Sequence, residues 1–200
     1  MLTDTQTAVK DAIRSFSQER IRPHSVAFEA NKGFPPELFV EMADLGLMGM
    51  TVPEDAGGGG ADYVSYALAL IELAAADGAL STVVSIQNSL LVSGILKYGT
   101  DAHRTRFLPD LIGGRMIGAF ALTETDAGSD ASAMRTRATR VEGGWRLNGS
   151  KQFITSGKIA GVTMVFAVTD PSAGKRGISG FLVPTDSPGY SVDKVEHKLG

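Results

Sequence analysis

Apolar residues recur at helical spacing through the first 115 residues of the chain. After a capping-box sequence at residues 3–6, Val9, Ala12, Ile13 and Phe16 fall on one face of a predicted helix. Further helices are expected at residues 36–45, 63–75, 80–98 and 101–112. The pattern predicts a helical N-terminal domain.

The pattern changes after Gly113-Gly114. From residue 117 onward the hydrophobic period is close to two and turn residues recur, which together indicate strands. The predicted strands cover residues 117–122, 134–141, 145–147, 152–155, 163–168, 178–183 and 190–195, with a turn at 142–144 and a hairpin signal at Asn148-Gly149. A helical part followed by an all-β part predicts an α+β fold of two domains, divided between residues 114 and 117.

The most apolar stretch, residues 67–96, is interrupted by Glu72, Asp77, Gln87 and Asn88. A membrane-spanning helix needs about 20 consecutive, largely apolar residues. We therefore expect two buried helices here and no membrane span. The first residues match neither a signal peptide nor an Arg-rich transit peptide, so a cytoplasmic location is expected, or the mitochondrial matrix for a mature eukaryotic chain.

Composition and charge exclude several kinds of site. The 200 residues carry a net charge of −3 and no cysteine, which rules out disulfides, thiolate metal sites and iron–sulfur clusters and gives no sign of nucleic-acid binding. His24, His103 and His197 lack ligand spacing, so no metal site is expected. The glycine run at 57–60 lacks the Gly-Lys-Ser/Thr of a phosphate-binding loop and is expected to be a flexible turn.

The residues with the clearest chemistry follow the apolar run at 117–122. Thr123 and Glu124 end this run, and a turn leads to Gly128-Ser129-Asp130. Such a turn brings hydroxyls and backbone N–H groups to one point, as a flavin or phosphate site requires. On spacing alone it is more typical of a tight turn in which Ser129 and Asp130 bond their own backbone. On its own, the segment leaves both interpretations open.

A second segment, residues 152–155, adds an aromatic ring and another hydroxyl at Phe153 and Thr155. Phe153 could form one wall of a site or pack as a core aromatic, and one ring can do both.

The ordered set of motifs resembles the acyl-CoA dehydrogenase family. It includes Ala-Leu-Thr-Glu-x-x-Ala-Gly-Ser-Asp at 121–130 and Leu-Asn-Gly-x-Lys-x-Phe-Ile-Thr at 147–155. Further matches extend over nearly the whole chain, at residues 52–58, 66–74, 98–100, 108–109, 177–179, 183–184 and 198–200. The resemblance implies an all-α domain at 1–115 and an antiparallel β-domain with a flavin and acyl-CoA site at 116–200. It also implies that the family's C-terminal helical domain is absent from this chain.

The resemblance implies FAD as the cofactor. Thr123 would hydrogen-bond the flavin ring system, and Ser129 would also contact the acyl-CoA substrate. Phe153, where many relatives carry tryptophan, would pack beside the isoalloxazine, and the Thr155 hydroxyl would approach its N5 edge. Glu124 would belong to this binding signature and would not be the catalytic base. The implied cofactor-binding residues are Phe120, Ala121, Leu122, Thr123, Glu124, Gly128, Ser129, Phe153, Ile154 and Thr155.

The implied reaction is α,β-dehydrogenation of a straight or lightly branched fatty acyl-CoA thioester. A carboxylate takes the α-proton, and the β-hydrogen leaves as hydride to flavin N5. Electron-transfer flavoprotein is the implied acceptor, and the full-length protein is expected to be a homo-oligomer, either a dimer or a tetramer. The catalytic glutamate is expected beyond Gly200, so no catalytic residue is assigned within this chain. The chain alone is expected to hold FAD weakly and to be inactive.

Three alternatives stay open: a non-catalytic flavin- or acyl-CoA-binding fragment, half of a split enzyme, or an oxygen-using relative similar to acyl-CoA oxidases. Two features receive no assigned role. His103 stands where relatives often have glutamine, on a helix surface. A basic stripe could meet the phosphates of CoA, although solvated arginines are the commoner case. The stripe consists of Arg135, Arg137 and Arg140.

Overall fold

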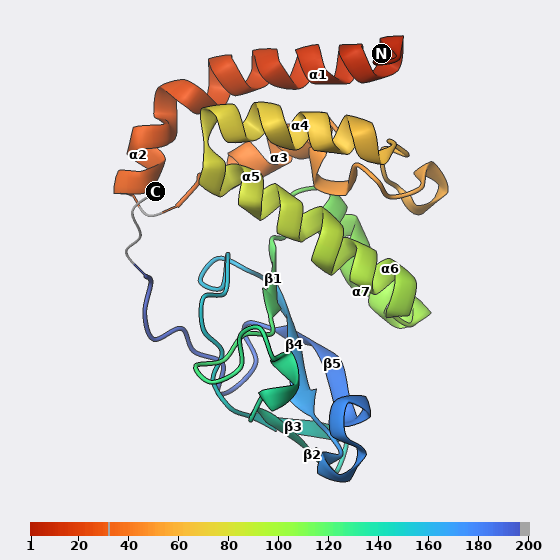
Figure 1. The fold of residues 1–200 in the computed structure, drawn as a ribbon, viewed down its shortest axis with the longest axis vertical. Coiled ribbons are helices and arrows are strands. Elements are labelled where there is room, and N and C mark those ends of the chain that lie inside the picture. Colours follow the sequence, from red (N-terminus) through yellow and green to blue (C-terminus); the bar gives the residue numbers. More distant parts are fainter. Residues whose placement is uncertain (32, 197–200) are drawn as a thin grey trace. The chain divides into compact units, whose positions relative to one another are not determined.

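The computed structural model describes residues 1–31 and 33–196 (Figure 1). Its internal contacts divide the described chain into a helical unit, residues 1–116, and a β unit, residues 117–196. Each unit has its own buried core. A helical unit followed by a β unit confirms the predicted α+β fold class.

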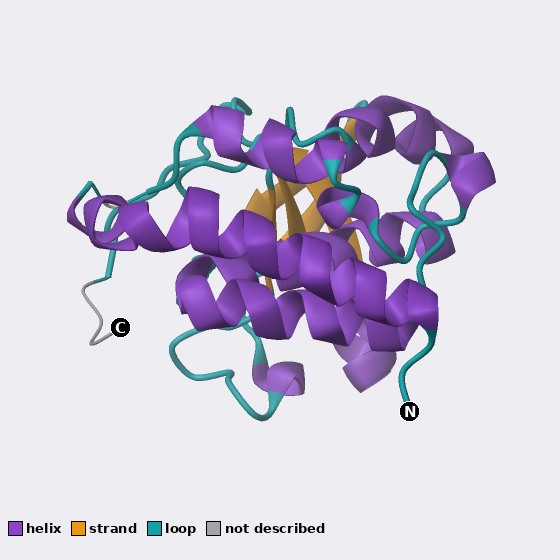
Figure 2. Ribbon diagram, turned by 90° about the horizontal axis from the view of Figure 1, so that it is seen from above, coloured by secondary structure: helices purple, strands orange, loops and turns teal. Residues whose placement is uncertain are grey.

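The helical unit contains the helices expected from the sequence, with small shifts at their ends, and one short helix at Ser25–Ala30 that was not predicted. They are α1 (Asp4–Phe16), α2 (Ser25–Ala30), α3 (Pro36–Asp44), α4 (Tyr63–Ala76), α5 (Gly78–Ser85), α6 (Ser93–Tyr98) and α7 (Asp101–Ile112). A π-helical stretch, Ile86–Val92, joins α5 to α6, so the chain is helical from Gly78 to Tyr98. Helix α4 lies beside α1 and α5 (Figures 1 and 2).

The polar residues that interrupt the apolar stretch each have a structural partner. Glu72 of α4 accepts two hydrogen bonds from Arg14 of α1, at 2.9 and 3.0 Å. Asp77 caps α5 by accepting from the N–H of Leu80 at 2.9 Å. Asn88 is fully buried and joins the 47–50 turn to its helix, since its amide accepts from Met50 N and donates to Leu47 O, each at 2.7 Å. Buried polar groups need such partners.

Among the described residues, Gly78–Tyr98 is the one helical segment long and apolar enough to span a membrane by length and composition. Half of its apolar window is buried inside the structure. Core helices commonly pass the same test, so the segment is weak evidence for a membrane span.

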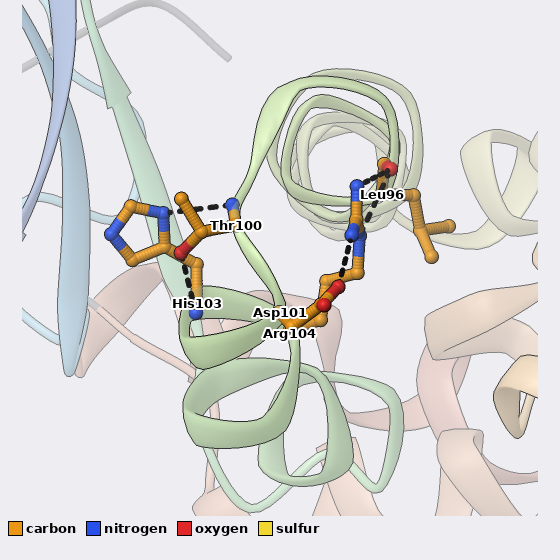
Figure 3. Close-up of polar contacts among 5 residues, drawn as sticks. All are labelled: Leu96, Thr100, Asp101, His103 and Arg104. Atoms are coloured by element: carbon orange, nitrogen blue, oxygen red, sulfur yellow. Dashed lines mark hydrogen bonds and ion pairs between the residues drawn. The ribbon is translucent and has the colours of Figure 1, made fainter.

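Helix α7 begins with a capping box in which histidine takes the position usual for glutamate or glutamine. The Thr100 hydroxyl accepts from the N–H of His103, and Nδ1 of His103 accepts from the N–H of Thr100, each at 3.3 Å (Figure 3). The next residue, Arg104, donates to Leu96 O at 3.0 and 3.2 Å and to Asp101 at 2.7 Å. These contacts give His103 a local structural role.

The glycine run at 57–60 forms a turn, as expected from the sequence, and the turn is held by hydrogen bonds. The four amide groups donate to the carbonyls of residues 54, 53, 49 and 52 in turn, at 2.8–3.1 Å. At Gly58, an added Cβ would lie 2.2 Å from the Cβ of Val52, so close packing requires glycine there. Because these N–H groups are already used, the run offers no cradle for a phosphate.

The β unit is built around β4. Its strands are β1 (Gly118–Ala121), β2 (Arg137–Val141), β3 (Gly144–Asn148), β4 (Val162–Val168) and β5 (Ile178–Pro184). One edge of β4 pairs with β5 in antiparallel register along its length. Its other edge pairs in parallel with β1 at residues 162–165 and with β2 at Val168. The sheet is therefore mixed and not wholly antiparallel, because the long connection from β1 to β4 allows parallel pairing.

Two predicted strands are wrong. Residues 152–155 run into a turn at 155–159, with positive φ values of 57° at Phe153 and 63° at Ser156, outside the strand region. Residues 190–195 form no strand. The hairpin between β2 and β3 turns at Glu142-Gly143 and not at Asn148-Gly149.

Candidate functional site

The residues after β1 form a tight turn that is anchored at both ends. Glu124 and Ala127 exchange two backbone hydrogen bonds, at 3.1 and 3.2 Å. Ala127 is buried in a cluster with Met134 and Val168. The chain then emerges at Gly128-Ser129, whose residues are exposed.

The tight-turn interpretation holds for Asp130 and not for Ser129. Asp130 accepts hydrogen bonds from the N–H and hydroxyl of Ser132 and so caps the short helical turn 131–133. In the described part of the chain, the hydroxyl and N–H of Ser129 have no protein partner, and neither does the N–H of Gly128. These donors remain available to a ligand.

The two candidate segments contact each other in the structure, although Leu122 of the first motif and Gly149 of the second are 27 residues apart in the sequence. Gln152 N–H donates to Thr123 O at 2.9 Å, and Lys151 Nζ donates to Leu122 O at 3.0 Å. The segment 153–155 therefore begins next to the strand end that carries Thr123.

The groups gathered here fit a planar, polar ligand with an apolar face. Across residues 1–31 and 33–196, the hydroxyls of Thr123, Ser129 and Thr155 contact no protein partner. Phe153 has 60% of its surface exposed, although a phenyl ring is usually buried. An added Cβ at Gly128 would meet nothing within 4 Å, so the protein leaves open space over this residue. A flavin ring has acceptor edges and apolar faces that match such a set.

Glu124 is turned inward and fully engaged. Its Oε2 accepts from the N–H of Arg135 at 2.6 Å, and its Oε1 accepts from the N–H and hydroxyl of Thr136 and from Lys151 Nζ, at 3.0, 2.5 and 2.8 Å. Burial by itself raises the pKa of Glu124, but the hydrogen bonds from Lys151, Thr136 and the two backbone N–H groups outweigh it and lower the pKa to about 2. A carboxylate held in this way is a poor general base.

The remaining candidates mainly build the scaffold. Phe120 packs against Phe166 with ring centroids 5.0 Å apart, and Ala121 is buried where β1 pairs with β4. Ile154 O accepts from Gly157 N–H at 3.2 Å and so closes the turn after Phe153.

The basic stripe does not form a single cluster. Arg135 pairs with Asp126 at 3.1 Å, and both side chains are exposed. Arg140 lies over the ring of Trp145 at 5.2 Å, on the edge of a shallow hollow of about 330 Å³ that Arg137 also lines. Among the described residues, no group of three potential metal ligands comes together.

Sequence reasoning missed Lys151 and Ser156. Lys151 stands inside the second motif, but its role depends on Glu124, 27 residues earlier, and local sequence does not show this pairing. The Ser156 hydroxyl is buried without a hydrogen-bond partner in the described structure, directly after Thr155.

The chain belongs to the acyl-CoA dehydrogenase family. The model of the acyl-CoA dehydrogenase N-terminal domain matches residues 3–115, and that of the middle domain matches residues 119–200. An acyl-CoA dehydrogenase of Bacillus subtilis (strain 168) is 41% identical over 199 residues, which cover 100% of this chain and 52% of the relative. This chain thus spans about half the length of the curated relatives it matches.

Solved structures agree with the family assignment. A glutaryl-CoA dehydrogenase from Mycobacterium smegmatis in complex with FADH2 has a TM-score of 0.92 and 39% identity, covering 99% of this chain and 50% of that chain. A chain in a structure titled for the electron transferring flavoprotein of Acidaminococcus fermentans has a TM-score of 0.94 and 37% identity, covering 100% of this chain and 53% of that chain.

Proposed function

We propose that this chain is part of an FAD-dependent enzyme that dehydrogenates the α–β bond of fatty acyl-CoA thioesters. One observation carries the proposal. Thr123 and Ser129 on one segment and Thr155 on the other carry hydroxyls without a partner among the described residues, Phe153 exposes its ring, and the hydrogen bond from Gln152 N–H to Thr123 O ties the two segments together. Family membership and the FADH2-bound neighbour support it.

The residues of the site divide into donors and a wall. Thr123, Thr155 and the N–H groups of Gly128 and Ser129 would donate to the acceptor edges of the flavin, and Phe153 would cover part of its apolar face. When bound, FAD would supply the hydride acceptor for the reaction. The protein's part is to orient the ring and the substrate and to keep water away from them.

The α-proton requires a base that these residues do not provide. Glu124 accepts hydrogen bonds from Lys151, Thr136 and backbone N–H groups, and these lower its pKa to about 2, so it is a poor acceptor for a substrate proton. We propose that the base is a glutamate beyond Gly200, in agreement with the relatives' greater length. Ser129 would contact the acyl-CoA substrate through its unpaired hydroxyl.

The substrate class proposed is a straight or lightly branched acyl-CoA, and the proposed acceptor is electron-transfer flavoprotein. The Acidaminococcus match supports the acceptor, because its title names that flavoprotein. We further propose a homo-oligomeric protein, a dimer or tetramer, in the cytoplasm or the mitochondrial matrix. One relative is bacterial and another, from Solanum tuberosum, is named as mitochondrial, which is the support for these two locations.

The proposal is tested by titrating the full-length protein with FAD and then adding butyryl-, isovaleryl- and glutaryl-CoA under anaerobic conditions. We expect FAD to bind and at least one thioester to bleach it, with electrons passing on to a dye or to electron-transfer flavoprotein. Thr155→Val is expected to weaken FAD binding, and Thr139→Val, an exposed threonine on β2, serves as the control.

The same experiment separates two alternatives. Rapid oxygen consumption with peroxide would favour an oxidase-like relative. FAD binding without bleaching by any thioester would favour the non-catalytic binding module.

A further inference from the structure

Two segments of the proposed flavin site are joined by a buried ion pair. Lys151 Nζ lies 2.8 Å from Glu124 Oε1, and each side chain is only 9% exposed. Lys151 also donates to Leu122 O at 3.0 Å. The ammonium group of Lys151 thus contacts Leu122 and Glu124, the residues on either side of Thr123.

The pair is connected to a wider framework. Glu124 also accepts from Arg135 N–H and from the N–H and hydroxyl of Thr136. Gly149, two residues before Lys151, passes so close to Thr136 that an added Cβ would lie 2.8 Å from the Cα of Thr136. Lys151 therefore approaches Glu124 from a backbone path that is itself tightly packed.

Energetics favour a positioning role over a stabilising one. The cost of removing two charges from water is comparable to their attraction, so a buried pair contributes little net stability compared with apolar residues of the same shape. What such a pair can provide is a defined register between two segments. Here the segments are 122–124 and 151–152. Phe153 and Thr155 follow directly after the second segment.

We propose that Lys151 and Glu124 are positioning residues that set the approach of the 153–155 segment to the Thr123–Ser129 turn. This inference rests on the proposed function, because the ligand whose binding depends on that approach is FAD. Neither side chain needs to touch the flavin. Their contacts fix the start of the segment that carries Phe153, whose φ is 57°, against the strand end that carries Thr123.

The test compares three variants of the full-length protein, Lys151→Met, the double variant Glu124→Gln/Lys151→Met, and Lys158→Met. Lys158 is an exposed lysine in the turn that follows the same segment, and it has no partner within the described structure. The readouts are the Kd for FAD, the visible circular dichroism of bound flavin and the urea midpoint.

Lys151→Met and the double variant are both expected to raise the Kd for FAD about tenfold and to change the flavin dichroism, while Lys158→Met stays within about twofold. The double variant leaves no unpaired buried charge, so its urea midpoint is expected to recover towards the parent value. Should Lys151→Met fail to fold, the double variant provides the same comparison.

A double variant with parental FAD affinity and parental dichroism would overturn the proposal. A parent protein that binds no FAD would instead contradict the proposed function. The positioning of the 153–155 segment would then be tested by amide hydrogen exchange at residues 150–157. The exchange is expected to be faster in the double variant than in the parent. Equal exchange would overturn the inference independently of the flavin.

Discussion

Single residues in the turn after β1 differ in where their polar groups are used. The carboxylate oxygens of Glu124 and Asp130 accept hydrogen bonds from protein donors. Thr123 and Ser129 keep hydroxyls that contact no protein partner within the described residues. Glu124 is buried, and buried polar groups cost free energy unless they are paired, so its contacts serve folding. Asp130 is exposed and caps the turn at 131–133. The hydroxyls of Thr123 and Ser129 are available for binding.

Glu124 is expected to make stability depend on pH. Its pKa is lowered to about 2 in the folded protein, below its ordinary value of 4.5, so its contribution is present above about pH 4.5 and is lost as the pH falls towards 2. Over that window the parent's free energy of unfolding is expected to fall by up to about 3 kcal/mol more than that of Glu124→Gln.

Urea unfolding at several pH values between 6 and about 2 measures this difference. Glu142→Gln, at the exposed β2–β3 turn, is the matched control and is expected to follow the parent. Parallel pH profiles for the parent and Glu124→Gln would contradict the prediction.

Gly128→Ala separates binding from folding. Its Cβ would meet no atom within 4 Å, so the free energy of unfolding is expected to change by less than about 0.5 kcal/mol. FAD affinity is expected to fall, because the methyl group would occupy the space left for the ligand. Titration with FAD and urea unfolding check both parts. Gly144→Ala, equally open in the protein, is expected to change neither, and equal FAD affinity in the two variants would refute the prediction.

At the scale of secondary-structure elements, ends and junctions decide the arrangement. Helices α1 and α7 begin with capping boxes, and Asp62 and Asp77 cap α4 and α5. Strand β4 connects the other strands of the β unit, because it pairs with β1, β2 and β5. Its central place explains how the 122–130 turn and the 151–155 segment, both outside the strands, can be held beside each other.

The cap of α7 is expected to be worth about 1 kcal/mol. Thr100→Ala removes the hydroxyl that accepts from His103 N–H, and it should lower the free energy of unfolding by that amount, whereas Thr100→Ser should retain most of it. His103→Gln should preserve the reciprocal bond, since a glutamine oxygen can accept from Thr100 N–H as Nδ1 does. Urea midpoints test the series, and a Thr100→Ala midpoint equal to that of the parent would exclude the effect.

At the scale of the whole molecule, ligand binding and folding are linked. A ligand that binds only the folded state stabilises it by about 2.7 kcal/mol at 100 times its Kd. FAD is therefore expected to raise the melting temperature in a concentration-dependent way, and Thr155→Val should need more FAD for the same rise. Differential scanning calorimetry measures the shift, with riboflavin as a ligand that lacks the adenine nucleotide. A melting temperature independent of FAD would contradict the proposed flavin site.

Much of the helical unit was predictable from sequence. The spacing of Val9, Ala12, Ile13 and Phe16 and the caps at residues 3–6 are local signals, and the helices form where those signals place them. Five of the seven predicted strands also correspond to strands of the described β unit. Local signals failed at Asn148-Gly149, where packing against Thr136 and not a hairpin requires the glycine.

The sequence by itself determined the helical and β parts, the family motifs and the absence of thiol chemistry, because periodicity, capping and composition act over a few residues. The tertiary structure alone decided that residues 152–155 form a turn and not a strand, that β1 and β4 run parallel, and that Lys151 meets Glu124. These features depend on which distant segments share a buried contact. Burial and pairing are properties of the folded chain as a whole, so no local pattern contains them.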